Sequence, residues 1–541
     1  KDINTNTFPI ASNPEHLTEV NGTLFFVASN TTTGQELWKS DGTASGTVLV
    51  KDIYSGLYNS SAINLTNVNG VLYFCADNGV NGQELWKSDG TEAGTMLVKD
   101  INPGLTGSSL IYLTDVNGEL YFIATNGVNG AELWKSDGSE AGTMMVKDIN
   151  PGAANSSPAD LTNVNGVLYF RATDGVNGVE LWNSDGTEAG TVMVKDVNPG
   201  AANSNPADLT NVNGILYFRS GDVVNGSELW KSDGTTAGTE MVKDIRAGSA
   251  SGNPLNLTNV NGVLYFSADD GVNGRELWKS DGTTAGTVII KDIYTGLNGS
   301  SPSSLISLNG VLFFEANNGT NGSELWKSDG TEAGTVITKD IYPGAFSSNI
   351  SGLTNVNGVL YFRADNGTNG QEPWKSDGTE AGTLQVKDIL NGASNSYPTG
   401  FTNVNGVLYF TANNNVNGQE LWKSDGTFAG TLLVKDIDPG ILGGNPSGLI
   451  DVNGVLYFSA DNGTNGFELW KSDGTETGTV MVKDIRPGVN GSDPQFLINV
   501  NGVLYFRAHN GTNGQELWKS DGTEAGTMLV KDIYTGVNSG N

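Results

Sequence analysis

Tryptophan recurs through this chain at one fixed interval of 48 residues. Every Trp of the sequence obeys the interval, so the chain holds eleven copies of one unit. Internal repetition with a period of about 20 to 50 residues is typical of propellers and solenoids. The repeat therefore predicts one array of similar units, which covers all but 13 of the 541 residues. The repeated residues are Trp38, Trp86, Trp134, Trp182, Trp230, Trp278, Trp326, Trp374, Trp422, Trp470 and Trp518.

Within one unit, the local signals all indicate strands and turns. In the unit that begins at Leu353, short runs rich in branched and aromatic residues alternate with turns rich in Gly and Asn. Asn357-Gly358 is the dipeptide most typical of a two-residue β-hairpin. No window has the i, i+3, i+4 spacing of an amphipathic helix, so a helix content near zero is predicted. The four expected strands cover residues 353–356, 359–364, 372–376 and 384–389.

Four antiparallel strands in a unit of this length are typical of a propeller blade. One such sheet has two apolar faces to bury, and a ring of sheets buries both faces of every blade without polar end caps. We therefore predict an all-β fold over residues 14–541, a single closed β-propeller of eleven four-stranded antiparallel blades. Two smaller rings of six and five blades are the alternative, although no linker interrupts the interval.

Two motifs of the repeat occur in different numbers. The tripeptide Lys-Asp-Ile/Val that closes the fourth strand occurs twelve times, against eleven Trp. Residues 1–13 are therefore expected to form an N-terminal arm with part of an extra repeat, Lys1–Ile3. This fragment is either a strand that pairs across the closure or the remnant of a twelfth repeat. Because the chain starts with Lys rather than Met, we expect a processed or truncated piece of a longer protein.

The charge balance and the residue counts exclude several classes of partner and site. Asp and Glu number 59 against 29 Lys and Arg, which gives a net charge of −30. Such a polyanion is repelled by nucleic acids and by anionic membranes, and no apolar run is long enough for membrane insertion. The single cysteine, Cys75, allows no internal disulfide and no Cys-based zinc site. Two histidines, His16 and His509, leave little for His-dependent catalysis, so no cofactor is predicted apart from the calcium discussed below.

The repeat resembles a family of bacterial secreted proteins. In the second unit, Glu84–Thr91 reads ELWKSDGT and is followed by Gly94-Thr95 and by VKDI at Val98–Ile101. This order is similar to the family signature ELWxxDGTxxGTxxVKDI, and the likeness covers nearly the whole chain. The resemblance implies a secreted or cell-surface repeat module without an assigned catalytic site. The positions that depart from the signature are Asn183, Pro373 and Thr338.

Trp, Glu and Asp recur in every unit and have two interpretations. The Trp could stack on sugars, and the Glu of ELW and the Asp of SDG could act as an acid–base pair. Because they recur in all eleven units, we interpret the Trp as core residues between blades and the carboxylates as hydrogen-bond partners in turns and strands. An enzyme usually breaks such symmetry at one place, and we find no such place, so the chain is predicted not to be an enzyme. Cys75 lies at a strand position that tolerates many residue types and is not interpreted as a nucleophile.

The loop between the second and third strands has a possible calcium-binding pattern. Asp77–Glu84 carries oxygen ligands at its positions 1, 2, 5 and 8, and Ca²⁺ takes six to eight oxygens. Loops that begin with Asp269, Asp365 and Asp461 are similar. Other copies have different residues at the first position, so a plain Gly-Asn turn is favoured over calcium.

One face of the propeller is predicted to bind a ligand. The NG[TV]NG loop and the long, variable loop between units share that face, and their Asn residues suit hydrogen bonds to a glycan or a protein surface. Repeated weak sites would gain from avidity. We therefore predict a non-enzymatic recognition and adhesion module that is extracellular or on the cell surface. The alternative is a self-assembling building block of a surface layer, sheath or fibre. The predicted ligand-binding residues are Asn81, Asn129, Asn177, Asn225, Asn273, Asn321, Asn369, Asn417, Asn465 and Asn513.

Overall fold

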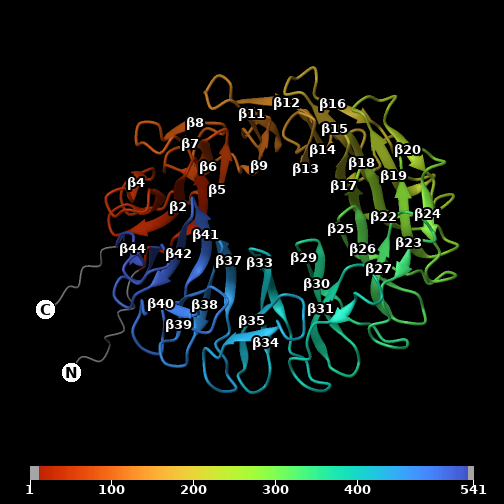
Figure 1. The fold of residues 1–541 in the computed structure, drawn as a ribbon. Coiled ribbons are helices and arrows are strands. Elements are labelled where there is room, and N and C mark those ends of the chain that lie inside the picture. Colours follow the sequence, from red (N-terminus) through yellow and green to blue (C-terminus); the bar gives the residue numbers. More distant parts are fainter. Residues whose placement is uncertain (1–10, 534–541) are drawn as a thin grey trace, which may run out of the picture. The chain divides into compact units, whose positions relative to one another are not determined.

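A computed structural model describes residues 11–533. This part of the chain contains 44 strands and no helix, and the strands form eleven four-stranded antiparallel sheets (Figure 1). The sheets have the arrangement of an eleven-bladed β-propeller. The predicted fold class is therefore confirmed, and we number the blades 1 to 11 along the chain. Within residues 11–533, no helix has the length and apolarity needed to cross a bilayer. Lys1–Ile3, predicted to belong to an extra repeat, lies outside the described residues.

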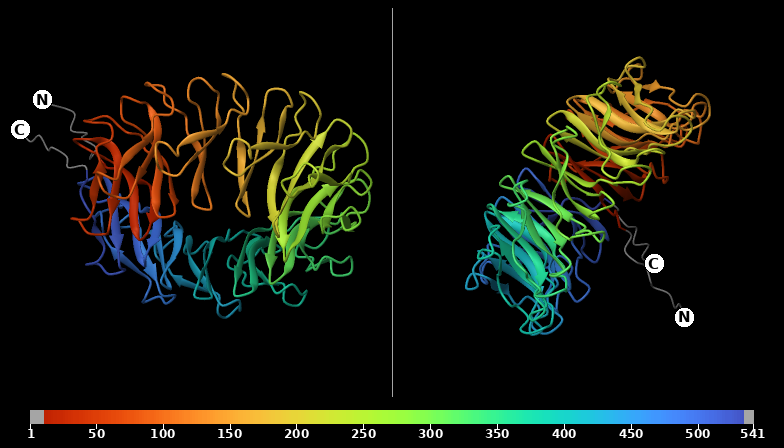
Figure 2. Two further views of the ribbon diagram at one scale, coloured as in Figure 1. Left: turned by 90° about the horizontal axis from the view of Figure 1, so that it is seen from above. Right: turned by 90° about the vertical axis from the view of Figure 1, so that its right-hand side faces the viewer.

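Each blade uses four consecutive strands, which run between two sets of loops (Figure 2). The first strands are β1 (Glu15–Val20), β5 (Ile63–Val68), β9 (Ile111–Val116), β13 (Ala159–Val164), β17 (Ala207–Val212), β21 (Leu255–Val260), β25 (Ser303–Leu308), β29 (Ser351–Val356), β33 (Thr399–Val404), β37 (Ser447–Val452) and β41 (Gln495–Val500). The second strands are β2 (Thr23–Asn30), β6 (Val71–Asp77), β10 (Glu119–Ala124), β14 (Val167–Thr173), β18 (Ile215–Asp222), β22 (Val263–Asp269), β26 (Val311–Asn317), β30 (Val359–Asp365), β34 (Val407–Asn413), β38 (Val455–Asp461) and β42 (Val503–His509).

The third strands carry the Trp of the repeat, and the fourth strands are the shortest. The third strands are β3 (Gly34–Ser40), β7 (Gln83–Ser88), β11 (Glu132–Ser136), β15 (Val179–Ser184), β19 (Gly226–Ser232), β23 (Arg275–Ser280), β27 (Ser323–Ser328), β31 (Gln371–Ser376), β35 (Gln419–Ser424), β39 (Phe467–Ser472) and β43 (Gln515–Ser520). The fourth strands are β4 (Val48–Lys51), β8 (Met96–Lys99), β12 (Met144–Lys147), β16 (Val192–Lys195), β20 (Glu240–Lys243), β24 (Val288–Lys291), β28 (Val336–Ile337), β32 (Leu384–Gln385), β36 (Leu432–Lys435), β40 (Val480–Lys483) and β44 (Met528–Leu529).

The Asn-Gly dipeptides set the turn between the first two strands of a blade. In blade 4, Asn165 and Gly166 have φ angles of 52° and 88°. A type I′ turn needs positive φ at both central residues, and its twist matches that of the flanking strands. The first strand also contains a bulge. In blade 5 the pairing of β17 with β18 shifts between Ala207 and Thr210, and Asp208 has a φ of 59°.

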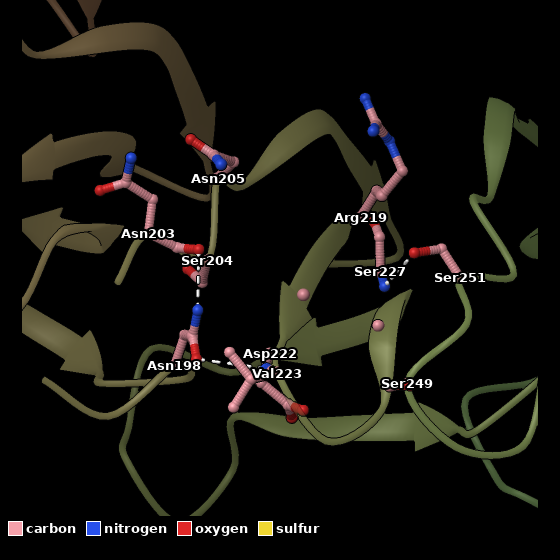
Figure 3. Close-up of a pocket in the computed structure, with 12 residues that line it drawn as sticks. Asn198, Asn203, Ser204, Asn205, Arg219, Asp222, Val223, Ser227, Ser249 and Ser251 are labelled. Carbon is pink, nitrogen blue, oxygen red and sulfur yellow. Dashed lines mark hydrogen bonds between the residues drawn. The ribbon is translucent and has the colours of Figure 1, made fainter. Parts of the chain in front are cut away.

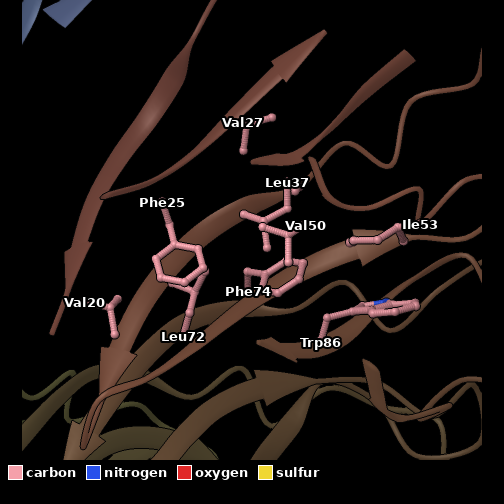
Figure 4. Close-up of a cluster of buried hydrophobic side chains, with 11 residues drawn as sticks. Val20, Phe25, Val27, Leu37, Val50, Ile53, Leu72, Phe74 and Trp86 are labelled. Atoms are coloured by element: carbon pink, nitrogen blue, oxygen red, sulfur yellow. The ribbon is translucent and has the colours of Figure 1, made fainter. Parts of the chain in front are cut away.

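The core consists of interfaces between successive blades, as Figure 4 shows for blades 1 and 2. Phe25 and Leu37 of blade 1 pack against Phe74 and Trp86 of blade 2. Phe74 is fully buried, and so are the equivalent Phe residues of the other ten blades. Full burial of a large apolar side chain contributes about 1.5–3 kcal/mol. Stability therefore comes mainly from contacts between blades, and the Trp of each unit is a core residue.

The described chain divides into two compact units. The first holds blades 1, 2, 9, 10 and 11 with residues 111–127 and 136–143 of blade 3, and the second holds residues 128–135 and blades 4 to 8 with residues 144–158.

In the first unit, blade 11 packs directly against blade 1. Tyr505 and Leu517 of blade 11 share a core cluster with Phe26 and Trp38 of blade 1. Rings of six and five blades would not bring the last blade onto the first, so that alternative is wrong.

Candidate functional site

Each blade buries one glutamate at the start of its third strand, and this residue holds the long loop that follows the blade. In blade 6, Glu276 is fully buried and accepts hydrogen bonds from the backbone N–H groups of Ile293 (3.1 Å), Tyr294 (2.9 Å) and Ser300 (2.8 Å). The hydroxyl of Ser300 donates a fourth hydrogen bond of 2.5 Å. Both carboxylate oxygens are therefore occupied, which supports the interpretation of these glutamates as structural residues.

Burial strongly perturbs these carboxyl groups. It raises the pKa of Glu276 to about 7 and that of Glu324 to about 8, and the nearby charge of Asp340 adds to the effect on Glu324. A carboxyl group with a pKa near neutrality suits general acid–base catalysis. A catalytic group must however reach a substrate, and these side chains have no exposed surface. Their raised pKa values thus follow from burial, and the hydrogen bonds from the loop offset part of that rise.

The Lys of the VKDI motif links a blade to the next, as in blades 4 and 5. In blade 4, Lys195 Nζ donates to the carbonyl oxygen of Thr239 in the next blade at 2.7 Å and lies 5.9 Å from the centre of the Trp230 ring. A cation above a Trp face gains about 0.5–2 kcal/mol, depending on its solvation. The sequence analysis did not single out this Lys, although its constant position before Asp was a visible signal.

The Asp of the SDG turn has a local structural role. In blade 5, Asp233 Oδ1 accepts hydrogen bonds from the backbone N–H of Thr235 (2.9 Å) and from its hydroxyl (2.8 Å). The same hydroxyl accepts a hydrogen bond from the N–H of Gly238 at 2.9 Å. These hydrogen bonds lower the pKa of Asp233. The interpretation as a turn residue agrees with this geometry.

The predicted ligand-binding Asn residues are half-buried and bonded within the protein. Asn81 Nδ2 donates to Asp100 Oδ2 of the VKDI motif at 2.5 Å, and Asn225 Nδ2 donates to Asp222 Oδ2 of its own loop at 2.8 Å. Asn129, Asn321, Asn417, Asn465 and Asn513 follow the first pattern, and Asn177 and Asn273 follow the second. Asn369 Oδ1 accepts a hydrogen bond from the Thr368 hydroxyl. A ligand would have to compete with these bonds, so ligand binding by the Asn set stays a prediction.

The calcium candidates act as turn residues in the structure. Asp77, Asp365 and Asp461 each accept a hydrogen bond from the N–H two residues later, at 2.7, 2.7 and 2.8 Å. Asp269 does the same and also forms an ion pair of 2.8 Å with Arg246. Across residues 11–533, no group of three or more His, Cys, Asp or Glu side chains is arranged to hold a metal ion. Calcium binding stays a prediction.

Cys75 and His509 offer no reactive group. Cys75 is fully buried, and burial raises the pKa of its thiol to about 12. The reactive form of cysteine is the thiolate, which such a pKa excludes at physiological pH. His509 Nδ1 accepts a hydrogen bond from the N–H of Gly511.

One pocket breaks the symmetry of the repeat. It lies at blade 5, has a volume of about 360 Å³, is open to solvent, and is lined by the long loops on both sides of this blade and by the loop between β18 and β19 (Figure 3). Its wall is polar and its side chains are mostly small. The lining residues are Asn198, Asn203, Ser204, Asn205, Arg219, Gly221, Asp222, Val223, Gly226, Ser227, Ser249 and Ser251.

Small residues at three positions open this pocket. Gly221 stands where the equivalent positions of other blades carry a side chain, for example Asp269 and Asp365. Ser227 replaces the Gln found in five other blades, and Ser249 replaces an apolar residue such as Leu105. Four other blades have Ala at the position of Ser249, but in a blade such as blade 2, which carries Asp77, Gln83 and Leu105, all three positions hold more side-chain volume than in blade 5.

The loop of blade 5 also follows a different path. Eight other blades have Gly at the third loop position, for example Gly367 with a φ of 76°. Blade 5 has Val223 there, and a β-branched residue does not adopt positive φ without strain. The β18–β19 ladder is accordingly longer by the pair Asp222 and Gly226. Val223 N–H donates to Asn198 Oδ1 at 3.3 Å and thereby fixes the loop against the wall of the pocket.

The features shared by the eleven units do not reveal this site, and neither do His residues or paired carboxylates that occur in one unit alone. The available signal was the stretch Arg219–Ser227, RSGDVVNGS, in which Ser-Gly replaces the usual Ala followed by a polar side chain.

Comparisons with known proteins give a likeness of fold alone. No protein-family model matches the sequence, and no curated protein matches it. A puromycin hydrolase structure matches with a TM-score of 0.27 and 13% identity over 72% of this chain and 62% of that one. A prolyl endopeptidase structure matches with a TM-score of 0.31 and 15% identity over 65% of this chain and 54% of that one. The structure of prolyl oligopeptidase B from Galerina marginata matches with a TM-score of 0.30 and 12% identity over 65% of this chain and 55% of that one. The chain thus spans less than two thirds of each of these proteins.

These matches correct the predicted function. The proteins named above are a hydrolase and peptidases, and none of them is an adhesin or a surface-layer protein. The prediction of a recognition and adhesion module, with its alternative of a surface-layer, sheath or fibre component, is therefore wrong. The structure gives a physical reason, since nine of the ten Asn side chains that were expected to form equal sites donate hydrogen bonds to Asp side chains within the protein.

Proposed function

We propose that this chain is a propeller without catalytic activity of its own that binds one small polar molecule in the pocket of blade 5. The observation that carries the proposal is the coincidence of Gly221, Ser227 and Ser249 around one cavity of about 360 Å³. Ligand sites of small molecules are concave and carry a few convergent polar groups. One site per chain follows, because the other blades have larger side chains at one or more of these three positions.

The wall of the pocket supports a polar ligand. Ser251 Oγ accepts a hydrogen bond from the N–H of Ser227 at 2.9 Å, which leaves its own hydroxyl hydrogen for another acceptor. Asn203 Oδ1 accepts from Val179 N–H at 2.8 Å, so its amide donors remain for a ligand. Val223, with 72% of its surface exposed, is the apolar member of the lining.

The buried glutamates support a chain without catalytic activity. These glutamates are fully buried, and their pKa values approach neutrality. Their carboxylate oxygens accept hydrogen bonds from loop N–H groups and, in most blades, from a Ser hydroxyl. Assays of the purified chain with chromogenic peptide and ester substrates between pH 5 and 8 are expected to give no turnover. A turnover that Glu324→Gln abolishes in a folded protein would contradict this part of the proposal.

The binding function is tested by ligand-observed NMR with a library of small polyols, amides, carboxylates, phosphates and amines. Hits are then measured by isothermal titration calorimetry against wild type and Gly221→Asp. Asp occupies the equivalent position in four other blades, so the variant is expected to fold. We expect one site per chain in the wild type and a loss of affinity of at least tenfold in the variant.

Thr173→Asp is the matched control. It introduces the same side chain at the same repeat position in blade 4, outside the lining of the pocket, and should leave the affinity unchanged. The proposal fails if no compound binds, if Gly221→Asp binds as well as wild type, or if several equal sites are found.

A further inference from the structure

We infer that the pocket of blade 5 selects an uncharged, hydroxyl-rich ligand, and that the ion pair Arg219–Asp208 sets this selectivity. The inference rests on the proposed function and names the chemical class of the ligand. Its basis is that the charged side chains which line the pocket already have partners within the protein: Arg219 pairs with a carboxylate, and Asp222 accepts hydrogen bonds from its own loop.

Arg219 is the positive residue of the lining. Its Nε lies 3.0 Å from Asp208 Oδ2, on the bulge of β17. Figure 3 shows its guanidinium group on the opposite side of the view from Asn198 and Asp222. The positive charge is therefore compensated before any ligand arrives, and an anion would have to compete with the carboxylate of Asp208.

Asp222 is the negative residue of the lining, and its oxygens are also engaged. Oδ1 accepts hydrogen bonds from the N–H groups of Val224 (2.7 Å) and Asn225 (2.6 Å), and Oδ2 accepts one from Asn225 Nδ2 (2.8 Å). A cationic ligand would have to compete with these donors for the carboxylate oxygens. Removing a charge from water without a partner of its own is costly, so a charged ligand gains less here than an uncharged one.

The groups that remain for a ligand are hydroxyls and amides. Ser227, Ser249 and Ser251 carry hydroxyl groups, each of which both donates and accepts hydrogen bonds. Asn203 and Asn205 add amide groups on the opposite loop. A hydroxyl group matches this mixture of donors and acceptors, because it has the same dual capacity. The chemistry of the wall thus fits an uncharged polyhydroxyl compound.

Three compounds that differ at one carbon test the charge selectivity by calorimetry. Sorbitol is uncharged, gluconate carries a carboxylate in place of one CH₂OH group, and glucamine carries an ammonium group. We expect sorbitol to bind the wild-type chain at one site and the two charged compounds to bind at least tenfold more weakly.

The selectivity should change when the ion pair is broken. Asp208→Asn leaves the charge of Arg219 without its partner and is expected to increase the affinity for gluconate relative to sorbitol about tenfold. The fold should tolerate this change, since Asn64 and Asn256 occupy the same bulge position with φ angles of 57° and 58°. Asp160→Asn is the control, because it breaks the equivalent pair with Arg171 (2.9 Å) in blade 4. It should leave both affinities unchanged.

The outcomes separate this inference from the proposed function. Binding of gluconate or glucamine as tight as that of sorbitol, or an unchanged preference in Asp208→Asn, overturns the inference while one ligand still occupies the pocket. Failure of sorbitol to bind also overturns the inference, and the library with Gly221→Asp then decides the proposed function independently.

Discussion

Blades 5 and 8 are built from the same 48-residue unit and lie in the same compact unit, but only blade 5 has the pocket. In blade 8, Asp365 closes its loop on the N–H of Gly367 at 2.7 Å. Gly367 lies directly under the ring of Tyr342, and an added Cβ there would be 2.2 Å from that ring. In blade 5, Gly221, Val223 and Asn198 occupy the three equivalent positions. The same space is thus filled by an aromatic ring in one blade and left open in the other.

The comparison teaches that the scaffold and the site depend on different residues. The buried Phe and the anchoring Glu are the same in both blades, and each blade has four antiparallel strands. The residues that differ lie in loops and do not pack between blades, so they vary without loss of the fold. A repeat protein can therefore acquire one site while ten blades keep the sequence that stability requires.

The largest effect is expected from giving blade 5 the side chains of its neighbours. The triple variant Gly221→Asp, Ser227→Gln, Ser249→Leu should abolish ligand binding, because the three side chains together fill the cavity. Its unfolding temperature should stay within a few degrees of that of the wild type, since other blades carry these residues. Calorimetry and thermal unfolding check the two statements, and retained binding would refute the assignment of the pocket.

A second prediction compares the two anchoring glutamates. Glu372 of blade 8 accepts hydrogen bonds from Ile389 N–H (2.9 Å) and from the N–H (3.1 Å) and hydroxyl (2.7 Å) of Ser396. Replacement by Ala leaves these buried donors without an acceptor and should lower the free energy of unfolding by about 3 kcal/mol.

Glu228 of blade 5 provides the matched case. Its loop has Gly252 where blade 8 has Ser396, so it accepts the N–H of Gly252 (2.6 Å) but no hydroxyl hydrogen bond. Glu228→Ala should therefore destabilise the protein less than Glu372→Ala, by about 1 kcal/mol. Urea unfolding of both variants measures the difference, and equal losses would contradict the role given to the Ser hydroxyl.

The pH dependence of stability should follow the same glutamates. Burial raises the pKa of Glu228 and of Glu372 to about 7 from the value of 4.5. The folded protein therefore holds these protons more tightly than the unfolded chain, and stability is lost as the pH rises through 7. The unfolding temperature should be highest near pH 5 and fall toward pH 8. Glu372→Gln should make this fall shallower, and a stability that increases from pH 5 to 8 would be the opposite result.

The smallest effect is expected from Val223→Gly, which gives blade 5 the loop residue of blade 8. Glycine permits the positive φ of Gly367 and so lets the loop adopt the wider path. The affinity for the ligand should fall a few-fold, because the wall formed by Val223 is lost, while stability changes by less than about 1 kcal/mol. A crystal structure of the variant would show whether the additional pair of the β18–β19 ladder is lost.

The sequence allowed most of the fold to be predicted because the repeat supplies eleven independent examples of each signal. The Trp interval gave the number of blades, and Asn-Gly gave the turns. The bulge at Asp208 and the donors to Glu276 depend on contacts with residues far along the chain, so local patterns did not reveal them. The pocket could not be predicted for a different reason: it forms where small residues leave space that larger side chains fill in other blades. A search of the sequence for reactive side chains does not detect such a space.

The closure between blades 11 and 1 has a consequence for how the chain could be rearranged. Ser12 donates its N–H to Glu516 at 3.0 Å, and Lys531 Nζ donates to the carbonyl oxygen of Thr47 at 2.9 Å. Blade 4 makes both bonds with blade 5, which follows it in sequence. By these contacts, blade 1 succeeds blade 11 as blade 5 succeeds blade 4. A gene that begins at blade 11 and continues into blade 1 would therefore encode this interface as an ordinary one between consecutive blades.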